Sequence, residues 1–185
     1  MGGLIGRKRG MTQLFDSSGQ VIVVTVIEAG PCPVTQVKTA KADGYGALQL
    51  SFGKKKREVR VANPDEYKVG QEIKVDIFKP GDAVKVTGKA IGKGFAGVVK
   101  RYHDHRGPMT HGSKSHRIPG SSGSGTTPGR VWPGRHMPGR LGGGTVSVKR
   151  AQIVQVDPEK NLLLVKGAVP GKPGNLLMIR KIKNG

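Results

Sequence analysis

The stretch from Lys85 to Arg150 most constrains what this chain can fold into. Between Asp82 and Asp157 the only acidic residue is Asp104, whereas the same span holds thirteen Lys and Arg and all five histidines. Half of the thirty glycines lie here, and apolar residues are too sparse to offset the ordering entropy of the chain. Because its like charges repel one another, the stretch predicts either a disordered arm or a loop shaped by a polyanion. We favour a loop that enters folded RNA.

The net charge of the whole chain supports a polyanionic partner. It is +20 over 185 residues, with a pI near 10.5, which indicates nucleic acid or an anionic membrane. No apolar run of about 18 residues and no long basic amphipathic helix occurs, so we expect no membrane partner. Met1 to Gly10 lacks the apolar run of a signal peptide. The lone Cys32 cannot form an internal disulfide, and both features favour a cytoplasmic location.

Outside the basic stretch, short apolar runs separated by turn signals predict a series of short strands. The expected strands span 11–15, 21–27, 34–38, 47–52, 72–78, 83–87, 146–156, 162–165 and 176–182. Residues 94–102 can form one short helix, and the Gly- and Arg-rich segment 2–10 is either a solvated terminus or a phosphate contact. Closed antiparallel barrels arise from such patterns. We therefore predict a mainly β protein: a small closed antiparallel β-barrel (1–87 and 146–185) with a long, basic, irregular loop extension (88–145).

Two glycine motifs resemble nucleotide-binding motifs, but the residues around them do not fit nucleotide binding. Gly92 to Gly97 matches G-x-G-x-x-G, but no β-α-β alternation surrounds it and no acid follows about twenty residues on. Gly107 to Ser115 is close to a phosphate-binding loop, yet Ser113 replaces its lysine and no Mg²⁺-binding acid follows before Asp157. We expect no cofactor, no small-molecule substrate and no catalytic residues.

The histidines offer one alternative of a different class. His103, His105, His111 and His116 with Asp104 could belong to a metal-dependent nuclease. Zinc sites need four converging ligands, often Cys pairs, and two-metal nucleases need several carboxylates. One Asp and no Cys pair argue against a metal site. We interpret the histidines as hydrogen-bond donors and stacking groups for RNA. A free nucleic-acid chaperone is a second alternative.

A tripeptide repeat is the most distinctive motif. Pro-Gly-Arg recurs every five residues and ends at Arg130, Arg135 and Arg140. Pro fixes φ, Gly permits turns, and each guanidinium can bind phosphates or base edges, which predicts an irregular ribbon with arginines at intervals. Trp132 lies within the repeat, where it either stacks on a base or an Arg or plugs the top of the barrel.

Several segments resemble a known family, the third protein of the large ribosomal subunit in its bacterial form. The resemblance is carried, in order and nearly end to end, by GRKRGM (6–11), AGPCPV (29–34), DGY (43–45), VDIFKP (75–80), the segment 86–100, HRIPGSSGSGTTPGRV (116–131) and NLLLVKGAVPG (161–171). It implies a barrel of the translation-protein type on the outside of the subunit and a loop that runs inward through rRNA. It further implies direct binding of 23S-type rRNA near its 3′ end and a role in starting subunit assembly.

Partners and site residues follow from the same resemblance and from the charge pattern. The implied neighbours are the fourteenth and nineteenth large-subunit proteins, in a cytoplasmic ribosome or its chloroplast counterpart. The loop tip near the peptidyl-transferase centre comprises Gly120, Ser121, Ser122, Gly123, Ser124, Gly125, Thr126 and Thr127. The candidate rRNA-binding residues are Arg7, Lys8, Lys93, Lys100, Arg101, His103, Lys114, His116, Arg117, Arg130, Trp132, Arg135 and Arg140.

Two departures from the family pattern bear on these expectations. Many bacterial members have a glutamine, methylated in some, where this chain has Ser124, so we expect no such mark here. The family also has a few tens more residues between the strands 47–52 and 75–78, and here the chain joins directly across that gap at Lys56-Arg57. Either this protein lacks that subdomain or the sequence omits it, and in both cases its contacts are not among those expected here.

Overall fold

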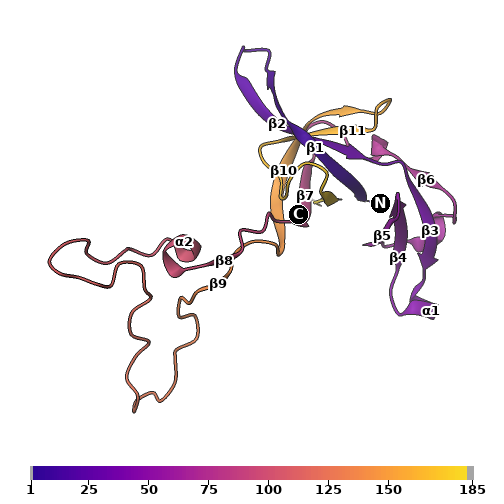
Figure 1. Cartoon of the computed structure of the whole chain (residues 1–185). Coiled ribbons are helices and arrows are strands. Elements are labelled where there is room, and N and C mark those ends of the chain that lie inside the picture. The colour runs from indigo at the N-terminus through magenta and orange to yellow at the C-terminus, as the bar shows by residue number, and fades with distance from the viewer. Residues whose placement is uncertain (1, 183–185) are drawn as a thin grey trace. The chain divides into compact units, whose positions relative to one another are not determined.

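The computed structural model describes residues 2–182, which are predominantly β-strand with a few short helical turns (Figure 1). The mainly β prediction is confirmed. The chain divides into two compact units, one comprising the residues up to Ala90 with those from Thr145 onward, the other Ile91–Gly144. No helix within 2–182 is long and apolar enough to cross a bilayer.

Six antiparallel strands of the first unit pair in a ring. In order of pairing they are β1 (Gly3–Phe15), β12 (Leu176–Lys181), β7 (Ala83–Lys89), β10 (Thr145–Asp157), β11 (Leu162–Lys166) and β2 (Val21–Ala29). The ladder between β2 and β1 brings the pairing order back to its start. Every strand of this ring therefore has two hydrogen-bonded neighbours, which leaves few open edges.

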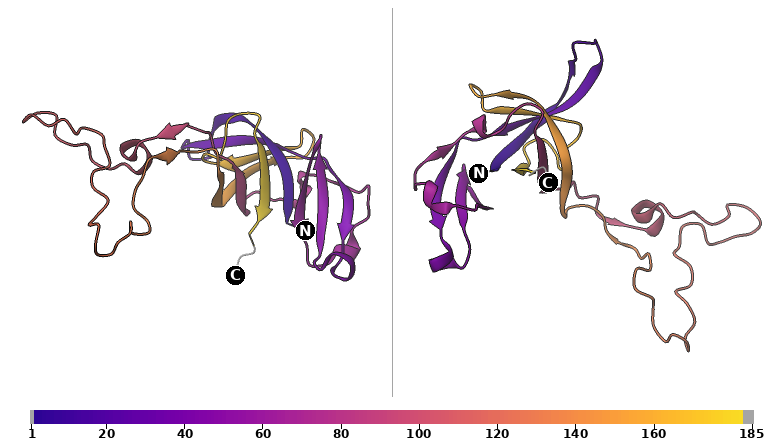
Figure 2. Two further views of the ribbon diagram at one scale, coloured as in Figure 1. Left: turned by 60° about the horizontal axis from the view of Figure 1, so that its bottom comes forward. Right: turned by 180° about the vertical axis from the view of Figure 1, so that it is seen from behind.

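A smaller sheet belongs to the same unit and lies beside the ring in both views (Figure 2). Its strand order is β5 (Lys55–Arg60), β4 (Ala47–Phe52), β3 (Cys32–Lys38) and β6 (Glu72–Ile73). One helical turn, α1 (Ala40–Asp43), joins β3 to β4, and Gly44 ends it at φ 79°, where its N–H donates to the Ala40 carbonyl. Two 3₁₀ turns, η1 (Pro64–Glu66) and η2 (Val75–Ile77), flank β6.

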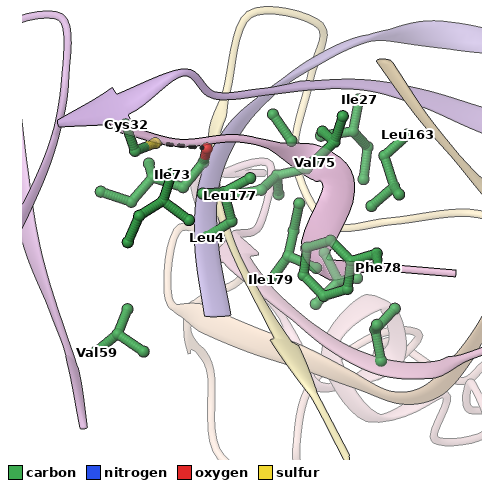
Figure 3. Packing of buried hydrophobic residues seen from close by; sticks show 14 of the residues in the cluster. Leu4, Ile27, Cys32, Val59, Ile73, Val75, Phe78, Leu163, Leu177 and Ile179 are labelled. Atoms are coloured by element: carbon green, nitrogen blue, oxygen red, sulfur yellow. Dashed lines mark hydrogen bonds between the residues drawn. The ribbon is translucent and has the colours of Figure 1, made fainter. Parts of the chain in front are cut away.

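One hydrophobic core joins the ring to the smaller sheet. Figure 3 shows Leu4, Leu163 and Ile179 of the ring and, in the same cluster, Val59 of the smaller sheet. Cys32 is fully buried, and its Sγ lies 3.4 Å from the carbonyl oxygen of Ile5. Burial raises the pKa of the Cys32 thiol to about 11, as expected for an inert packing residue.

The prediction of a strand over 72–78 is wrong beyond Ile73. Ile73 and Val75 are buried alternately, as a strand would have them, but the backbone then enters the 3₁₀ turn η2. The N–H of Phe78 donates to the Val75 carbonyl at 2.9 Å. Because residues three apart superpose in a 3₁₀ turn, Phe78 returns to the core that Val75 already occupies.

The N-terminal segment forms a strand instead of a solvated terminus. Residues 3–7 pair with β12, and residues 6–15 pair with β2. Glycine is required here by close packing: a Cβ on Gly6 would lie 2.8 Å from the Glu28 carbonyl oxygen and 2.9 Å from Cγ2 of Ile27. The glycines at positions 3 and 6 therefore reflect tight strand contacts, whereas a Cβ on Gly10 would have no neighbour within 4 Å.

The strands also extend slightly into the predicted loop extension. Gly88, placed in the extension by the sequence, pairs with Val146 of β10 and Leu177 of β12, and Lys89 pairs with Thr145. A Cβ on Gly88 would lie 2.6 Å from Cδ2 of Leu177. The glycine thus serves packing within the ring.

Removing core volume should destabilise this unit strongly. Leu163→Ala deletes a fully buried side chain of β11, and we expect the free energy of unfolding to fall by about 2–5 kcal/mol. Val69→Ala is the matched control because Val69 is 66% exposed, and its effect should stay below about 0.5 kcal/mol. Urea denaturation of the full chain measures both. Equal effects of the two substitutions would contradict the core described here.

Candidate nucleic-acid interface

The second unit, Ile91–Gly144, is called the basic extension from here on. It has nine Lys and Arg against one acid, Asp104. Its buried apolar side chains are Ala96 and Val98. So small a core cannot by itself offset the ordering entropy of the segment, and the contacts that shape it are mainly polar.

A short ladder forms the base of the basic extension. Strand β8 (Phe95–Ala96) pairs with β9 (Gly139–Arg140), and the backbones of Lys93 and Gly94 exchange hydrogen bonds of 2.8 Å with Leu141. Gly139 also permits a close approach, because a Cβ there would lie 2.5 Å from Nη1 of Arg101. The two ends of the extension are thereby held together over residues 93–96 on one side and 139–141 on the other.

Beyond this ladder, aromatic and charged side chains join the two arms of the extension. The helical turn α2 (Val98–Tyr102) presents Tyr102, whose ring is parallel to that of His136 at a centroid distance of 4.0 Å. Nδ1 of His136 lies 2.8 Å from a carboxylate oxygen of Asp104. The guanidinium of Arg101 donates to the carbonyl of Met137 at 2.7 Å. We call Arg101, Tyr102, Asp104 and His136 the stacking cluster.

Nearer the tip, a second set of contacts shapes the arms. Nη2 of Arg135 donates to the carbonyls of Pro119 and Ser121 at 2.8 and 2.7 Å. Nδ1 of His116 lies 2.9 Å from the carbonyl oxygen of Pro108. Arg135 therefore holds the backbone of the segment that leads into the tip, a role for which its planar fork of donors is well suited.

Most of the candidate rRNA-binding residues are exposed on the basic extension. Trp132 is 60% exposed, and the guanidinium of Arg130 lies 5.6 Å from its ring centroid. Of the two interpretations of Trp132, stacking on an Arg is therefore present within the basic extension. The exposed candidates are Lys93, Lys100, His103, Lys114, Arg117, Arg130, Trp132, Arg135 and Arg140, and Arg101 and His116 are half-buried.

The predicted tip is exposed throughout, from Gly120 to Thr127. Gly120 and Gly123 have φ of 72° and 126°, so the backbone there uses conformations that side chains disfavour. Ser124 lies between two glycines in the same exposed segment. A tip of small residues lets a backbone approach a partner closely.

The three Pro-Gly-Arg repeats do not share one conformation. Gly129 and Gly134 have positive φ, whereas Gly139 is extended and paired in β9. The predicted ribbon of evenly spaced arginines is therefore not uniform. Of its arginines, Arg135 holds the backbone of the extension and Arg130 lies over Trp132.

Of the two candidates in the first unit, one is unavailable to RNA. Lys8 is 7% exposed, and its Nζ donates to the carbonyls of Val169 and Gly171 at 3.0 and 2.9 Å. The prediction of phosphate contact at Lys8 is corrected, because its ammonium satisfies carbonyls within its own unit. Arg7 is exposed, with its guanidinium 5.8 Å from the ring centroid of Phe52.

The histidines do not gather into a metal site. Within residues 2–182 no group of three or more His, Cys, Asp or Glu side chains could hold a metal ion. Asp104, the one carboxylate near the histidines, is bonded to His136. The metal-dependent nuclease is therefore not favoured.

Sequence reasoning missed the stacking cluster and the ladder of β8 and β9. One feature of the sequence could have indicated the cluster. Asp104 is the only acid in a long basic stretch, so a contact between its carboxylate and a nearby cationic side chain could have been predicted. Nothing in the sequence identifies His136 as that partner from among five histidines. A ladder of two residues per strand is too short to give a period.

Comparison with known proteins places these features in a family. The family model for Ribosomal protein L3 matches residues 4–161. The chain is 52% identical to the large ribosomal subunit protein uL3 of Gloeothece citriformis (strain PCC 7424), covering 98% of this chain and 97% of that protein. It is 48% identical to the protein of the same name from Thermosynechococcus vestitus (strain NIES-2133 / IAM M-273 / BP-1), covering 98% and 96%.

The alignments also bear on the shortened segment at Lys56-Arg57. The alignment to the Gloeothece citriformis protein spans 205 positions, more than the 185 residues of this chain, so that relative has residues that this chain lacks. In the structure, Lys56 and Arg57 lie within β5, which pairs with β4 from Lys55 to Arg60 without interruption. The β4–β5 hairpin is complete without additional residues.

Replacing Lys8 should affect stability. Lys8→Ala leaves two carbonyls without their donor, and we expect the free energy of unfolding to fall by about 1–3 kcal/mol. The control is Lys160→Ala, since Lys160 lies in the exposed turn between β10 and β11. Thermal unfolding of both variants tests this. A Lys8→Ala protein as stable as the control would refute the internal role of Lys8.

Arg135 should order the segment before the tip even without RNA. Arg135→Ala removes the donor to Pro119 and Ser121, so amide hydrogen exchange at 120–123 should be about fivefold faster, as expected for ~1 kcal/mol. Arg130→Ala loses the same charge but no backbone contact of this kind, and exchange at 120–123 should be unchanged. If both variants accelerate exchange equally, charge rather than the Arg135 contacts controls the segment.

Proposed function

The chain belongs to the ribosomal protein L3 family of the large ribosomal subunit, and from that premise we propose that it is a structural, non-enzymatic component that binds 23S-type rRNA. The observation that carries the proposal is the composition of the basic extension. It contains nine Lys and Arg and a single acid, and it has almost no core. A segment of this kind gains order by displacing counterions from phosphates.

The exposed side chains of the basic extension suit folded RNA. Lys93, Lys114 and Arg117 offer charge to phosphates, and Trp132 with His103 offers surfaces for stacking on unpaired bases. Arg101 and Arg135 support these contacts indirectly, because they hold the two arms together, and His116 supports them by binding the Pro108 carbonyl within one arm. The proposed binding set therefore retains the predicted residues other than Lys8.

The finer role rests on the family resemblance. We infer that the protein binds near the 3′ end of the rRNA, helps to start subunit assembly, and directs the tip 120–127 toward the peptidyl-transferase centre. Its protein neighbours would be the fourteenth and nineteenth large-subunit proteins, in a cytoplasmic ribosome or its chloroplast counterpart. The six-stranded ring would be the closed barrel of the translation-protein type, with its six antiparallel ladders as support.

The domain division supports the same proposal. We propose that residues 1–87 and 146–185 anchor the protein and that 88–145 penetrates rRNA. The support is a ring with its own buried core and an extension that almost lacks one. Serine at position 124 lacks the amide that is methylated in some relatives, so this tip would be unmodified there.

Sedimentation of ribosomes separates this proposal from a free nucleic-acid chaperone. Gradients of the native source at 50 and 500 mM salt should show the protein with the large subunit at both concentrations, because salt screens buried charge pairs much less than exposed ones. A free chaperone would remain near the top of the gradient even at low salt. That outcome would overturn the proposal.

Binding of the full chain to 23S-type rRNA should depend on individual exposed arginines. Arg117→Ala should weaken binding and lower the slope of log K against log salt by about 0.7–0.9, as expected for one lost phosphate contact. Lys160→Ala, which removes a charge outside the basic extension, should leave the slope unchanged. Filter binding at several salt concentrations measures both. An unchanged affinity and slope for Arg117→Ala would count against this contact.

A further inference from the structure

The hairpin of β1 and β2 continues beyond the ring (Figures 1 and 2). The outer neighbour of β1, strand β12, pairs with it only over residues 3–7. The outer neighbour of β2, strand β11, pairs with it only over 24–28. From Gly10 to Val23 the two strands therefore have essentially only each other, and a two-stranded ribbon is marginal in water.

One face of this ribbon is apolar and exposed. Phe15 pairs with Val21, Gln13 with Val23, and Met11 with Thr25, so these side chains lie on the same face. Met11, Phe15, Val21 and Val23 are 49%, 69%, 53% and 49% exposed. We call these four residues the hairpin patch. Four large apolar side chains on one exposed face indicate a surface that another molecule covers.

The hairpin patch continues a face that is buried farther along β2. Val21, Val23, Thr25 and Ile27 alternate along the strand, so they share one face. Thr25 and Ile27 are fully buried inside the unit, whereas Val21 and Val23 lie beyond the part of β2 that pairs with β11. The apolar alternation of a core-facing strand therefore continues into a region where no other part of this unit packs against it.

Charge decides which class of molecule covers the hairpin patch. Between Arg9 and Lys38 there is no Lys, Arg or His, and there are two acids, Asp16 and Glu28. This is the reverse of the chain as a whole, whose net charge is +20. A surface for RNA would need cations beside its apolar groups, since phosphates accompany every base. Asp16, in the turn of the hairpin, would repel a polyanion and attract a basic partner.

We propose that the hairpin patch is a protein-binding surface, separate from the RNA-binding residues, whose partner is another protein with an apolar centre and a neutral or basic rim. Phe15 is the anchor, because it is the largest and most exposed of the four side chains and aromatic anchors dominate such interfaces. This inference rests on the proposed function, which already includes protein neighbours, and it deepens that function by assigning one of their contacts to a surface outside the basic extension.

Photo-crosslinking of the full-length protein tests this surface. A photoreactive phenylalanine analogue replaces Phe15 in one version and Val21 in a second, and the protein is purified within native large subunits. The matched control places the analogue at Thr12, which is exposed but lies on the opposite face of the same strand. We expect both patch positions to crosslink to the same segment of one protein, present in equal amount to this chain. The Thr12 position should yield at most about one tenth of that product.

Other outcomes overturn the proposal in distinguishable ways. Crosslinks to rRNA would make the hairpin patch an RNA contact, and crosslinks to a second copy of this chain would make it a self-association surface. No product, or many unrelated proteins, would show that no dedicated partner covers it. If the protein does not sediment with the large subunit at all, the proposed function fails instead of this inference.

A substitution provides an independent measurement. Phe15→Asp should abolish the crosslink from position 21, because it places a charge at the centre of the interface. Its rRNA affinity and salt slope should remain those of the unmodified chain, since no residue of the basic extension changes. Because Phe15 is 69% exposed, the variant should also unfold at the same temperature. Loss of RNA binding with an unchanged crosslink would contradict the separation of the two surfaces.

Discussion

The ladder between β7 and β10 is the constraint on which the rest of the structure depends. It pairs Lys89 with Thr145, so the residues on either side of the basic extension are neighbours in the ring. Closing a loop of this length costs conformational entropy, and the ring, with its buried core, is what offsets that cost. The basic extension therefore does not need a large core of its own. Its sequence can instead be rich in Lys and Arg, which carry charge, and in Gly, which allows close approach of the backbone.

Much of the first unit was predictable because its strands alternate and its turns carry clear signals. The strand at 47–52 has the predicted bounds, and a turn at Asp16–Gly19 joins the strands predicted at 11–15 and 21–27. The failures have physical causes. Gly3 and Gly6 in segment 2–10 are needed for close strand contacts, a reason that only the packed neighbours reveal. The 3₁₀ turn at 75–77 keeps its apolar residues buried at a spacing that a strand would also allow.

The candidate site was predictable in composition and unpredictable in detail. Charge located the basic extension, but charge cannot tell a lysine that faces solvent from one that binds internal carbonyls. Lys8 is the clear case, since its neighbours Arg7 and Arg9 are exposed while it is buried. Likewise the stacking of Tyr102 on His136 joins residues far apart in sequence, and no local pattern announces such a pair.

The glycines of the Pro-Gly-Arg repeat have a consequence for mirror-image chemistry. Gly129 and Gly134 have positive φ, the region that a D-amino acid prefers, so D-alanine introduced there by chemical synthesis would keep the backbone conformation. Gly139 is extended, with the Arg101 guanidinium close to where an L-alanine methyl would stand. The glycine of the repeat is thus required for its positive φ at positions 129 and 134, and for the space it leaves to the Arg101 side chain at position 139.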